Sequence, residues 1–418
     1  MKFKKFILFF YFFLMIYKPE FIFIYPSVNT FFGILGLGFY LTRRTYRYQI
    51  ISNSKAYYKP LFISYLLVVF ICLFSIVINA SVELHYVKYF VSIVLYYFMA
   101  YLGAWGFYKV YSEVTPKILI NYFVAAALLH VGISLAMFAN STINDLLLSL
   151  IRVSKGEADV MDITLGSRLQ GFGATFYTSG LINGYILIIL AFTMYVESFS
   201  FPKKMIYLVA YVIIFVVGIM IARTIMIGGA IGLLVILYSM LHSGKDLFKN
   251  ILIILFSAIF LVFVGIKFIS ASGIDFEQLS QFGFEMFRML AEGETSSHST
   301  DSMMNMYDVI PDNLKTWIIG DSQWVGKNGG YYKEVDIGYL RNIFYFGILG
   351  SLFFYLYNWV VLKRVVLQKN VFGNKSKIVF LTLIFYTVVL NFKGTVDLYY
   401  YILPYYFCFN KKLCYENR

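Results

Sequence analysis

Three arginines lie at the ends of long apolar stretches of the sequence: Arg168, Arg223 and Arg341. A charged side chain in lipid costs about 3 kcal/mol unless it faces a cavity, a partner or an anion, so each position needs a reason. Arginine presents several N–H donors in a planar fork and stays protonated, which suits a two-point grip on phosphate oxygens. We therefore expect the three side chains to lie at one depth and to hold a diphosphate together.

A less specific interpretation exists for each arginine. The side chain could extend to the lipid headgroups, or pair with a loop carboxylate such as Asp162 or Asp336. Arg223 argues most strongly against this alternative, because it lies in an apolar hairpin with no acidic residue near it in sequence. For the set of three, we favour a shared anionic ligand.

Small residues follow each arginine. They are Gly180 and Gly184 after Arg168, Gly228 and Gly232 after Arg223, and Gly347 and Ser351 after Arg341. Small residues four positions apart let helix backbones approach closely in a membrane. We therefore expect the three helices that carry the arginines to pack together.

The composition indicates the class of protein that must position these residues. Hydrophobic residues make up 60% of the chain and charged residues only 14%, whereas charged residues approach about 25% in soluble proteins. This is the composition of an all-α polytopic membrane protein. The net charge of +13 reflects basic loops on one side of the membrane, so we expect no nucleic-acid partner.

About twelve apolar stretches are long enough to cross a bilayer, which needs about 20 residues for each helix. We place them at 6–24, 28–42, 60–80, 86–108, 117–139, 174–196, 204–222, 224–241, 250–269, 338–361, 377–392 and 397–410. The last two could form one re-entrant pair, because the connection between them is short. We expect residues 1–418 to form a single integral membrane domain.

The loops predict the orientation of the chain and the side on which it works. Most lysines and arginines fall in loops on the side of the N-terminus, and most acidic residues on the other side, so both termini are expected in the cytoplasm. The two long loops, about 140–173 and 270–336, then lie outside. Within the second, residues 276–290 could form an amphipathic helix at the interface. The function is therefore expected at the outer face.

Candidates for a general base lie in the second outer loop. His298 is the histidine of that loop, and an unperturbed imidazole titrates near neutral pH. Its serine-rich surroundings are equally consistent with a solvated surface histidine. Glu292, Glu294 and Asp336 are alternatives, and Asp336 could instead orient Arg341. The three cysteines and the spacing of the histidines give no sign of a metal site, so we expect neither metal nor cofactor.

Aromatic residues cluster in the same loop: Trp317, Trp324, Tyr331, Tyr332 and Tyr339. Membrane proteins generally carry such rings in belts at both water interfaces. Rings beside glycines in an outer loop could alternatively stack on sugars. If they do, we expect Trp324, Tyr332 and Tyr339 to contact the saccharide or the acceptor.

These motifs, in this order, resemble a known family. An arginine in Gly166-Ser167-Arg168-Leu169-Gln170-Gly171, Ala222-Arg223-Thr224 at a hairpin, a large loop after the ninth span, and Asp336-Ile337-Gly338-Tyr339-Leu340-Arg341 before Gly347 look like the O-antigen and capsular polysaccharide polymerases of the Wzy type. Asn391-Phe392-Lys393 also matches a recurrent element of these polymerases. The related O-antigen ligases share this architecture. The resemblance covers the whole chain in topology and the part from about residue 165 in motifs.

The resemblance implies a multi-span, GT-C-like inverting glycosyltransferase in the bacterial cytoplasmic (inner) membrane. Its donor would be a glycan on undecaprenyl diphosphate, and a lipid-linked repeat unit would be the acceptor. Fixed arginines could stabilise the departing diphosphate without a metal. A chain-length regulator and a flippase are conceivable partners.

Two alternatives use the same lipid-linked saccharide. A flippase would carry the repeat unit across the bilayer, and should place charged residues along a path through several helices rather than at the outer ends. A ligase would share the donor and transfer the finished glycan to another acceptor. Deletion separates these functions, because loss of a polymerase leaves glycans of one repeat, whereas loss of a flippase leaves none.

Overall fold

The computed structural model describes residues 2–42, 55–153, 161, 168–174, 176–243, 285, 298–326 and 329–409. This part of the chain is helical and contains no β-strand, only two isolated bridges. Seven of its helices are long and apolar enough to cross a membrane. The prediction of an all-helical polytopic membrane protein is confirmed at this level, and the number of twelve spans stays a prediction.

Helices occur at the expected spans throughout the described residues. They are α1 (Lys2–Tyr17), α2 (Val28–Thr42), α4 (Lys55–Ile78), α5 (His85–Val110), α6 (Pro116–Ala139), α9 (Phe176–Val196), α10 (Phe201–Ile221), α11 (Ile225–Ser243), α16 (Gly338–Val366), α18 (Ser376–Asn391) and α19 (Tyr399–Phe409). The expected span 250–269 and most of the expected interfacial helix 276–290 lie outside the described residues. The first helix ends at Tyr17 rather than at residue 24, because Lys18 has a positive φ of 51° and Pro19 follows it.

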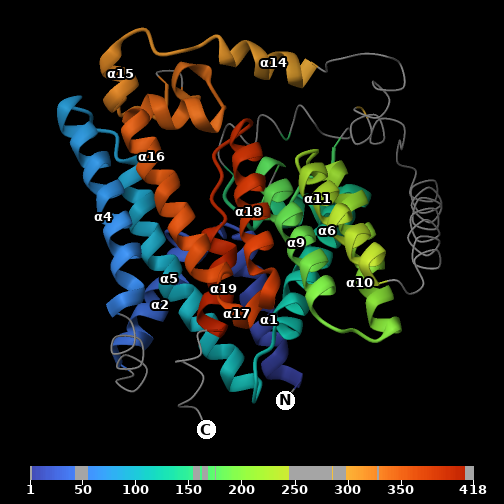
Figure 1. Ribbon diagram of the computed structural model, residues 1–418. Coiled ribbons are helices and arrows are strands. Elements are labelled where there is room, and N and C mark those ends of the chain that lie inside the picture. Colours follow the sequence, from blue (N-terminus) through green and yellow to red (C-terminus); the bar gives the residue numbers. More distant parts are fainter. Residues whose placement is uncertain are drawn as a thin grey trace. The chain divides into compact units, whose positions relative to one another are not determined.

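The chain forms two compact units, Met1–Val28 with Glu113–Thr295 and Asn29–Ser112 with Ser296–Arg418. In the first unit, α9 is the central helix and contacts α1, α6, α10 and α11 (Figure 1). A short helix, α7 (Ser141–Ser149), follows α6 and is capped by Asn140, whose Oδ1 accepts the Ile143 N–H at 3.2 Å. Because α9 is apolar on all sides and almost wholly buried, it forms the core of this unit.

Small residues allow α9 and α11 to touch along their backbones. A Cβ on Gly180 would lie 2.0 Å from Oγ1 of Thr224, and a Cβ on Gly228 would lie 2.4 Å from Cα of Gly184. Neither contact could exist with a larger residue. The expected close packing of the helices after Arg168 and Arg223 is therefore confirmed.

In the second unit, α16 contacts α4, α18 and α19, and α5 packs against α19 (Figure 1). Four short elements complete it: α14 (His298–Tyr307), α15 (Leu314–Ile319), η1 (Tyr332–Glu334) and α17 (Lys369–Phe372), with the 3-10 turn η2 (Gly373–Lys375) before α18. Helix α15 begins with an Asn313 cap, whose Oδ1 accepts the Thr316 N–H at 2.9 Å. It packs against α16 at the point where that helix is interrupted.

Helix α16 is interrupted one third of the way along, although the sequence predicts a continuous span. Phe346 and Gly347 have non-helical backbone angles, with φ of 68° at Gly347. The carbonyls of Phe344 and Tyr345 instead accept the N–H groups of Asp321 at 2.6 Å and Ser322 at 2.9 Å. A Cβ on Gly347 would lie 2.2 Å from the Ile318 backbone, so this small residue does permit close approach, and its partner is α15.

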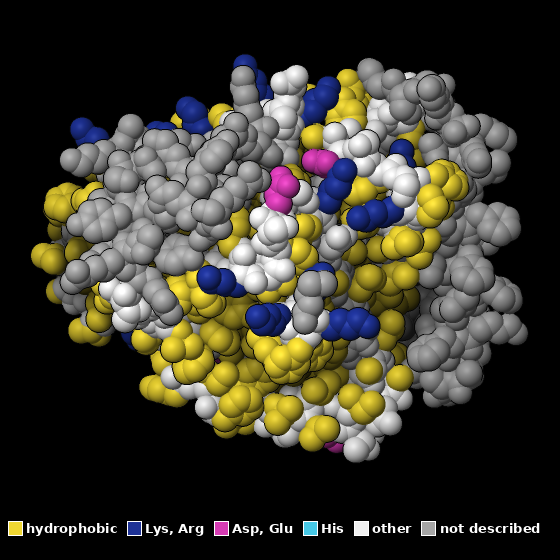
Figure 2. Space-filling model, turned by 90° about the horizontal axis from the view of Figure 1, so that it is seen from below, with side chains coloured by type: hydrophobic (Ala, Val, Ile, Leu, Met, Phe, Trp, Pro, Cys, Tyr) yellow, Lys and Arg dark blue, Asp and Glu magenta, His cyan; other side chains and the backbone are white. Residues whose placement is uncertain are grey.

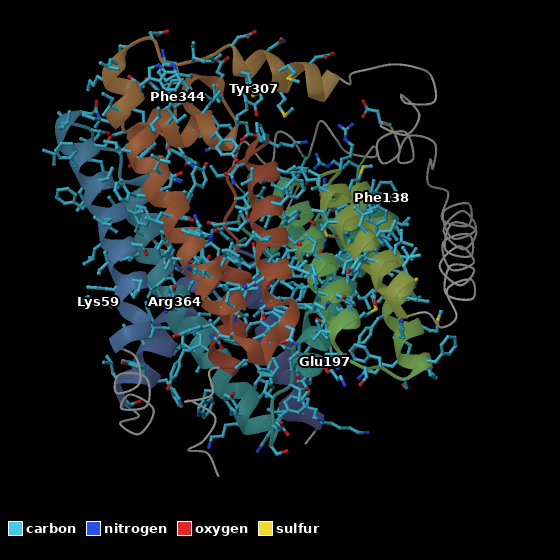
Figure 3. The ribbon with its side chains drawn as sticks, in the orientation of Figure 1. Lys59, Phe138, Glu197, Tyr307, Phe344 and Arg364 are labelled. Carbon is cyan, nitrogen blue, oxygen red and sulfur yellow. The ribbon has the colours of Figure 1, made fainter. Side chains whose placement is uncertain are left out.

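Each unit has two distinct ends. In the second unit, Lys59 and Arg364 lie at the end opposite Tyr307 and Phe344, and in the first, Glu197 lies opposite Phe138 (Figure 3). In the second unit, two loops predicted to share a side of the membrane, those at Lys59 and Arg364, therefore lie at a common end. The face seen from below in Figure 2 carries Lys and Arg side chains spread among apolar ones, as expected of a basic membrane face.

Candidate functional site

The turn between α10 and α11 presents Arg223. Helix α10 ends at Ile221, Ala222 is extended with φ of −154° and ψ of 119°, and α11 begins at Ile225. The turn is fixed by the packing of Thr224 against Gly180 of α9. Arg223 therefore projects from a tight turn held on a buried helix, with its side chain 21% exposed.

Arg168 docks on the end of the same hairpin. Its Nε donates to the Ile221 carbonyl at 2.7 Å, and the Leu169 N–H donates to the Met220 carbonyl at 3.0 Å. The last carbonyls of a helix have no partner within the helix, so Arg168 and Leu169 cap α10. The guanidinium carbon also lies 4.2 Å from the centre of the Phe176 ring, so the side chain contacts the first residue of α9.

The structure thus brings Arg168 and Arg223 into one electrostatic environment. Burial, and then the positive charge of Arg223, lower the pKa of Arg168 to about 10. The side chain stays protonated at neutral pH, but its charge is disfavoured there. An anion bound between the two guanidinium groups would relieve both the desolvation and the repulsion.

One premise drawn from the sequence is wrong. Arg223 has an acidic partner, because its Nη1 donates to the Glu285 carboxylate in an ion pair. Glu285 follows in the sequence by 62 residues and belongs to the stretch expected to be an amphipathic helix. Sequence proximity could not reveal this pairing, and the two arginines and Glu285 together carry one net positive charge.

Arg341 lies in the second unit, in the first turn of α16. The side chain is only 8% exposed. Its guanidinium carbon lies 3.6 Å from the centre of the Trp324 ring and 3.7 Å from that of Tyr331. Nη1 donates to Asp336 at 3.1 Å, as anticipated, while Nε is buried without a hydrogen-bond partner among the described residues. We call Arg341, Trp324, Tyr331 and Asp336 the arginine cage.

The first residue of α5 and the turn before it contact Trp324 of the cage. His85 stacks on Trp324 with ring centres 4.4 Å apart and planes 11° apart. The Glu83 carboxylate accepts a hydrogen bond from the backbone N–H of Trp324 at 2.8 Å. Nothing in the sequence indicated that Glu83, His85 or Tyr331 would lie beside Arg341. Their distance in sequence from Arg341 left no local signal.

A chain of buried polar groups joins the cage to the Asn391-Phe392-Lys393 motif. The Tyr86 hydroxyl donates to the side-chain Oδ1 of Asn342, Asn342 Nδ2 donates to the Tyr355 hydroxyl at 2.9 Å, and the Tyr355 hydroxyl lies 3.5 Å from Asn391 Oδ1. Since Asn342 adjoins Arg341, this network fixes the first turn of α16 against α5 and α18. Two motifs quoted for the family resemblance therefore meet in one unit.

The proposed sugar-contacting residues have different surroundings. Both faces of Trp324 are covered, by His85 and Arg341. The Tyr332 hydroxyl donates to Asp321 at 3.1 Å, and burial together with Asp321 raises its pKa to about 12. Tyr339 donates to the Val388 carbonyl at 2.8 Å. Their contact with sugars stays a prediction, and Trp324 could stack on a sugar only after losing one of its two neighbours.

The candidate bases are less well defined. Glu292 and Glu294 lie outside the described residues, and His298 is described only as the first residue of α14. Asp336 pairs with Arg341, and desolvation raises its pKa although Arg341 and Lys393 act in the opposite direction. A carboxyl that is easier to protonate fits proton transfer, whereas its geometry fits the orientation of Arg341.

The fold and these sites define the chain as a polytopic helical membrane protein with arginines at helix ends. Searches against protein-family models, curated proteins and solved structures found no match. Among the described residues, no group of three His, Cys, Asp or Glu side chains could hold a metal ion. The arginine sites are therefore the features from which a function can be inferred.

Proposed function

We propose that the protein polymerises lipid-linked oligosaccharide repeats on the outer face of a bacterial cytoplasmic membrane. The observation that carries the proposal is the Arg168 and Arg223 pair, held at the end of one helical hairpin. Although Glu285 pairs with Arg223, burial and then the Arg223 charge still lower the pKa of Arg168, so a bound anion would favour the charged form of Arg168. A diphosphate attached to a membrane lipid is an anion of suitable charge at such a depth. Arg341, whose guanidinium lies against Trp324 and Tyr331 in the second unit, stays a predicted donor-binding residue.

The reaction needs little from the protein beyond positioning and charge. The acceptor hydroxyl attacks the anomeric carbon of the donor, its proton passes to a base, and the bond from that carbon to the diphosphate oxygen breaks. The electron pair leaves with the diphosphate, where negative charge develops. Fixed guanidinium groups stabilise that charge without reorganisation, and each interaction of about 3 kcal/mol made only in the transition state gives roughly a hundredfold in rate.

The distribution of charge favours polymerisation over transport. A flippase needs polar groups along a path through the membrane, yet α9, the central helix of the first unit, has no charged residue between Phe176 and Val196. The arginines lie at helix ends instead. A ligase would use the same donor site, so the acceptor alone separates it from a polymerase.

The test replaces Arg168, Arg223 and Arg341 singly, first by alanine and then by lysine, in cells that make the surface polysaccharide. We expect the alanine variants to lose long chains and keep glycans of one repeat. Lysine should restore little, because it lacks the planar fork. Arg364→Ala, at the opposite end of α16, is the control and should keep long chains.

The outcomes distinguish the candidate functions. Long chains in all three alanine variants would refute the proposal. Complete loss of surface glycan, including the single repeat, would indicate a flippase. Long chains that accumulate on the lipid carrier without transfer to their final acceptor would indicate a ligase. Membrane levels of each variant, measured by immunoblotting, exclude misfolding as the cause.

A further inference from the structure

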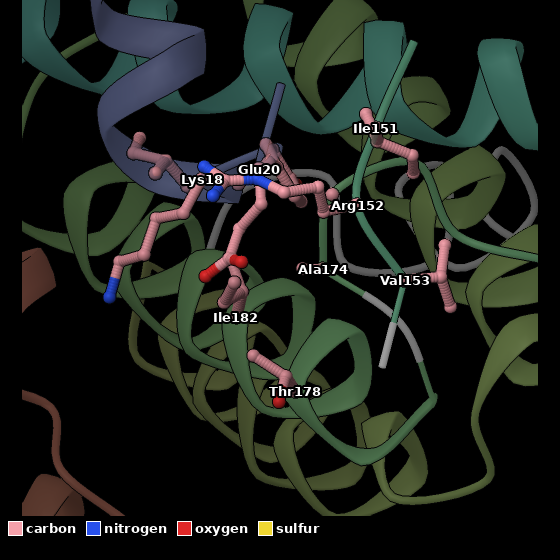
Figure 4. Close-up of a pocket in the computed structure, with 11 residues that line it drawn as sticks. Lys18, Glu20, Ile151, Arg152, Val153, Ala174, Thr178 and Ile182 are labelled. Carbon is pink, nitrogen blue, oxygen red and sulfur yellow. The ribbon is translucent and has the colours of Figure 1, made fainter. Parts of the chain in front are cut away.

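A cavity of about 280 Å³ lies in the first unit, among the end of α1, the segment around Arg152 and the first turns of α9 (Figure 4). Its charged residues are Lys18, Glu20 and Arg152, and Thr178 adds a hydroxyl. The rest of the lining is mainly apolar, with three isoleucines among it, Ile16, Ile151 and Ile182. None of these residues has a role in the proposed donor site. Ligand pockets generally measure about 300 to 1,000 Å³, so this one suits a single small ring.

The walls of the cavity are held in place before any ligand binds. Residues Phe21 and Ile151 form an antiparallel bridge, and the Arg152 N–H donates to the Glu20 carbonyl at 2.6 Å. Nη2 of Arg152 donates to the carbonyls of Ile24 at 2.7 Å and Pro26 at 2.6 Å. The guanidinium thus holds the loop after α1 through Nη2, while its Nε is buried without a hydrogen-bond partner among the described residues.

The opposite wall requires a glycine. Gly173 has a φ of 84°, and a Cβ there would lie 2.6 Å from the Tyr17 carbonyl oxygen. Beneath it, His130 stacks on Tyr17 with ring centres 4.1 Å apart and lies 3.2 Å from the Ala174 carbonyl. The segment 168–174 therefore connects Arg168 to the cavity wall. One end is held by the hydrogen bond of Arg168 to Ile221, and the other by the contacts of Gly173 and Ala174.

Glu20 and Thr178 supply side-chain hydrogen-bond acceptors to the lining. The Glu20 side chain has no hydrogen bond or ion pair among the described residues, and it lines the cavity together with Ile182 of α9 (Figure 4). The exposed Thr178 hydroxyl lies one turn from Ile182. A carboxylate and a hydroxyl above an apolar floor can bind neighbouring sugar hydroxyls or an amine, because both present donors.

We propose that this cavity binds one neutral or amino sugar ring, with Glu20 and Thr178 as its hydrogen-bonding residues. The inference rests on the proposed function for its biological meaning, since a sugar held in the same unit as Arg168 and Arg223 would be the ring of a lipid-linked saccharide nearest the reaction. The binding itself can be measured without any turnover.

The experiment uses the full chain in lipid nanodiscs and saturation-transfer NMR. The probes are methyl glycosides of glucose, galactose, N-acetylglucosamine and glucosamine, with glucuronate and inorganic phosphate as comparison anions. We expect millimolar binding of at least one neutral or amino glycoside. Glu20→Gln should weaken it about tenfold, as expected for loss of a hydrogen bond to a charged group, and Thr178→Phe should abolish it by filling the cavity. Glu197→Gln, at the other end of α9, is the matched control.

Three results would overturn the proposal: no glycoside binds to the unmodified protein, Glu20→Gln binds as well as the unmodified protein, or only the two anions bind. Thr178→Phe could fail to fold, but the near-isosteric Glu20→Gln leaves the test intact. Arg168→Ala separates this inference from the proposed function. Long polysaccharide chains in that variant and in its Arg223 and Arg341 counterparts would refute the polymerase, whereas glycoside binding alone decides the cavity.

Discussion

The geometry of the arginine cage allows us to predict how strongly Arg341 and Trp324 stabilise each other. Arg341 lies between Trp324 and Tyr331 at 3.6 and 3.7 Å from their ring centres and is only 8% exposed. A cation over an aromatic ring contributes about 0.5 to 1 kcal/mol at an exposed site and about 2 kcal/mol when desolvated. We therefore expect a coupling energy of about 1 to 2 kcal/mol between Arg341 and Trp324.

A double-mutant cycle isolates this coupling. The variants are Arg341→Ala, Trp324→Ala and the double substitution, and the measurement is hydrogen exchange of backbone amides in the loop. The Tyr332 N–H is a suitable reporter, because it donates to the Trp324 carbonyl at 3.1 Å. Each 1.4 kcal/mol corresponds to a tenfold change in exchange, so the coupling should appear as a roughly 5-fold to 30-fold departure from additivity.

A matched control pair lies at the other end of α16. Lys363 Nζ lies 5.3 Å from the Trp359 ring centre, as a single contact with an exposed ring. Its cycle, followed at the Leu367 N–H that donates to the Lys363 carbonyl at 3.2 Å, should show the smaller coupling. If the Arg341 and Trp324 substitutions add to within about 0.4 kcal/mol, the cage is not an energetic unit and the reasoning fails.

Two further predictions concern pH and backbone strain. Desolvation raises the pKa of Asp336, so the folded form binds the carboxyl proton more tightly than the unfolded form. The loop that carries Trp324 and Tyr331 should therefore become more protected from hydrogen exchange as the pH falls from the raised pKa of Asp336 to the ordinary one. Asp336→Asn should remove this pH dependence, and an unchanged pH profile in that variant would contradict the prediction. Gly173→Ala should destabilise the first unit by about 1 to 3 kcal/mol, because the residue has a φ of 84° and a Cβ would lie 2.6 Å from the Tyr17 oxygen. Gly132→Ala in α6, where a Cβ meets nothing within 4 Å, should be neutral or stabilising, and equal melting temperatures for the two variants would refute the strain argument.

Apolar length predicted most of the helices, since a bilayer demands about 20 apolar residues whatever their order. It could not predict the break in α16, because Gly347 in an apolar run is equally typical of helix packing. Helix α1 ends early for a reason visible in the sequence, Pro19, although the positive φ of Lys18 is visible only in the structure.

The surroundings of the arginines were predictable only where the partner is close in sequence. Asp336 stands five positions before Arg341, and its pairing was anticipated. Glu285 pairs with Arg223 across 62 residues, and His85 reaches the cage through Trp324. The cap that Arg168 places on Ile221 also depends on how helices pack. Such contacts follow from tertiary structure, which residue types and spacing do not encode.

The interruption of α16 gives its carbonyls two competing sets of partners. In an uninterrupted helix the Phe344 and Tyr345 oxygens would accept N–H groups from four residues further along, but here they accept those of Asp321 and Ser322. If α16 became a continuous helix, the segment that carries Asp321, Ser322 and Trp324 would lose these hydrogen bonds at the same time. The contact of Trp324 with Arg341 therefore depends on the break in α16, the helix that carries Arg341.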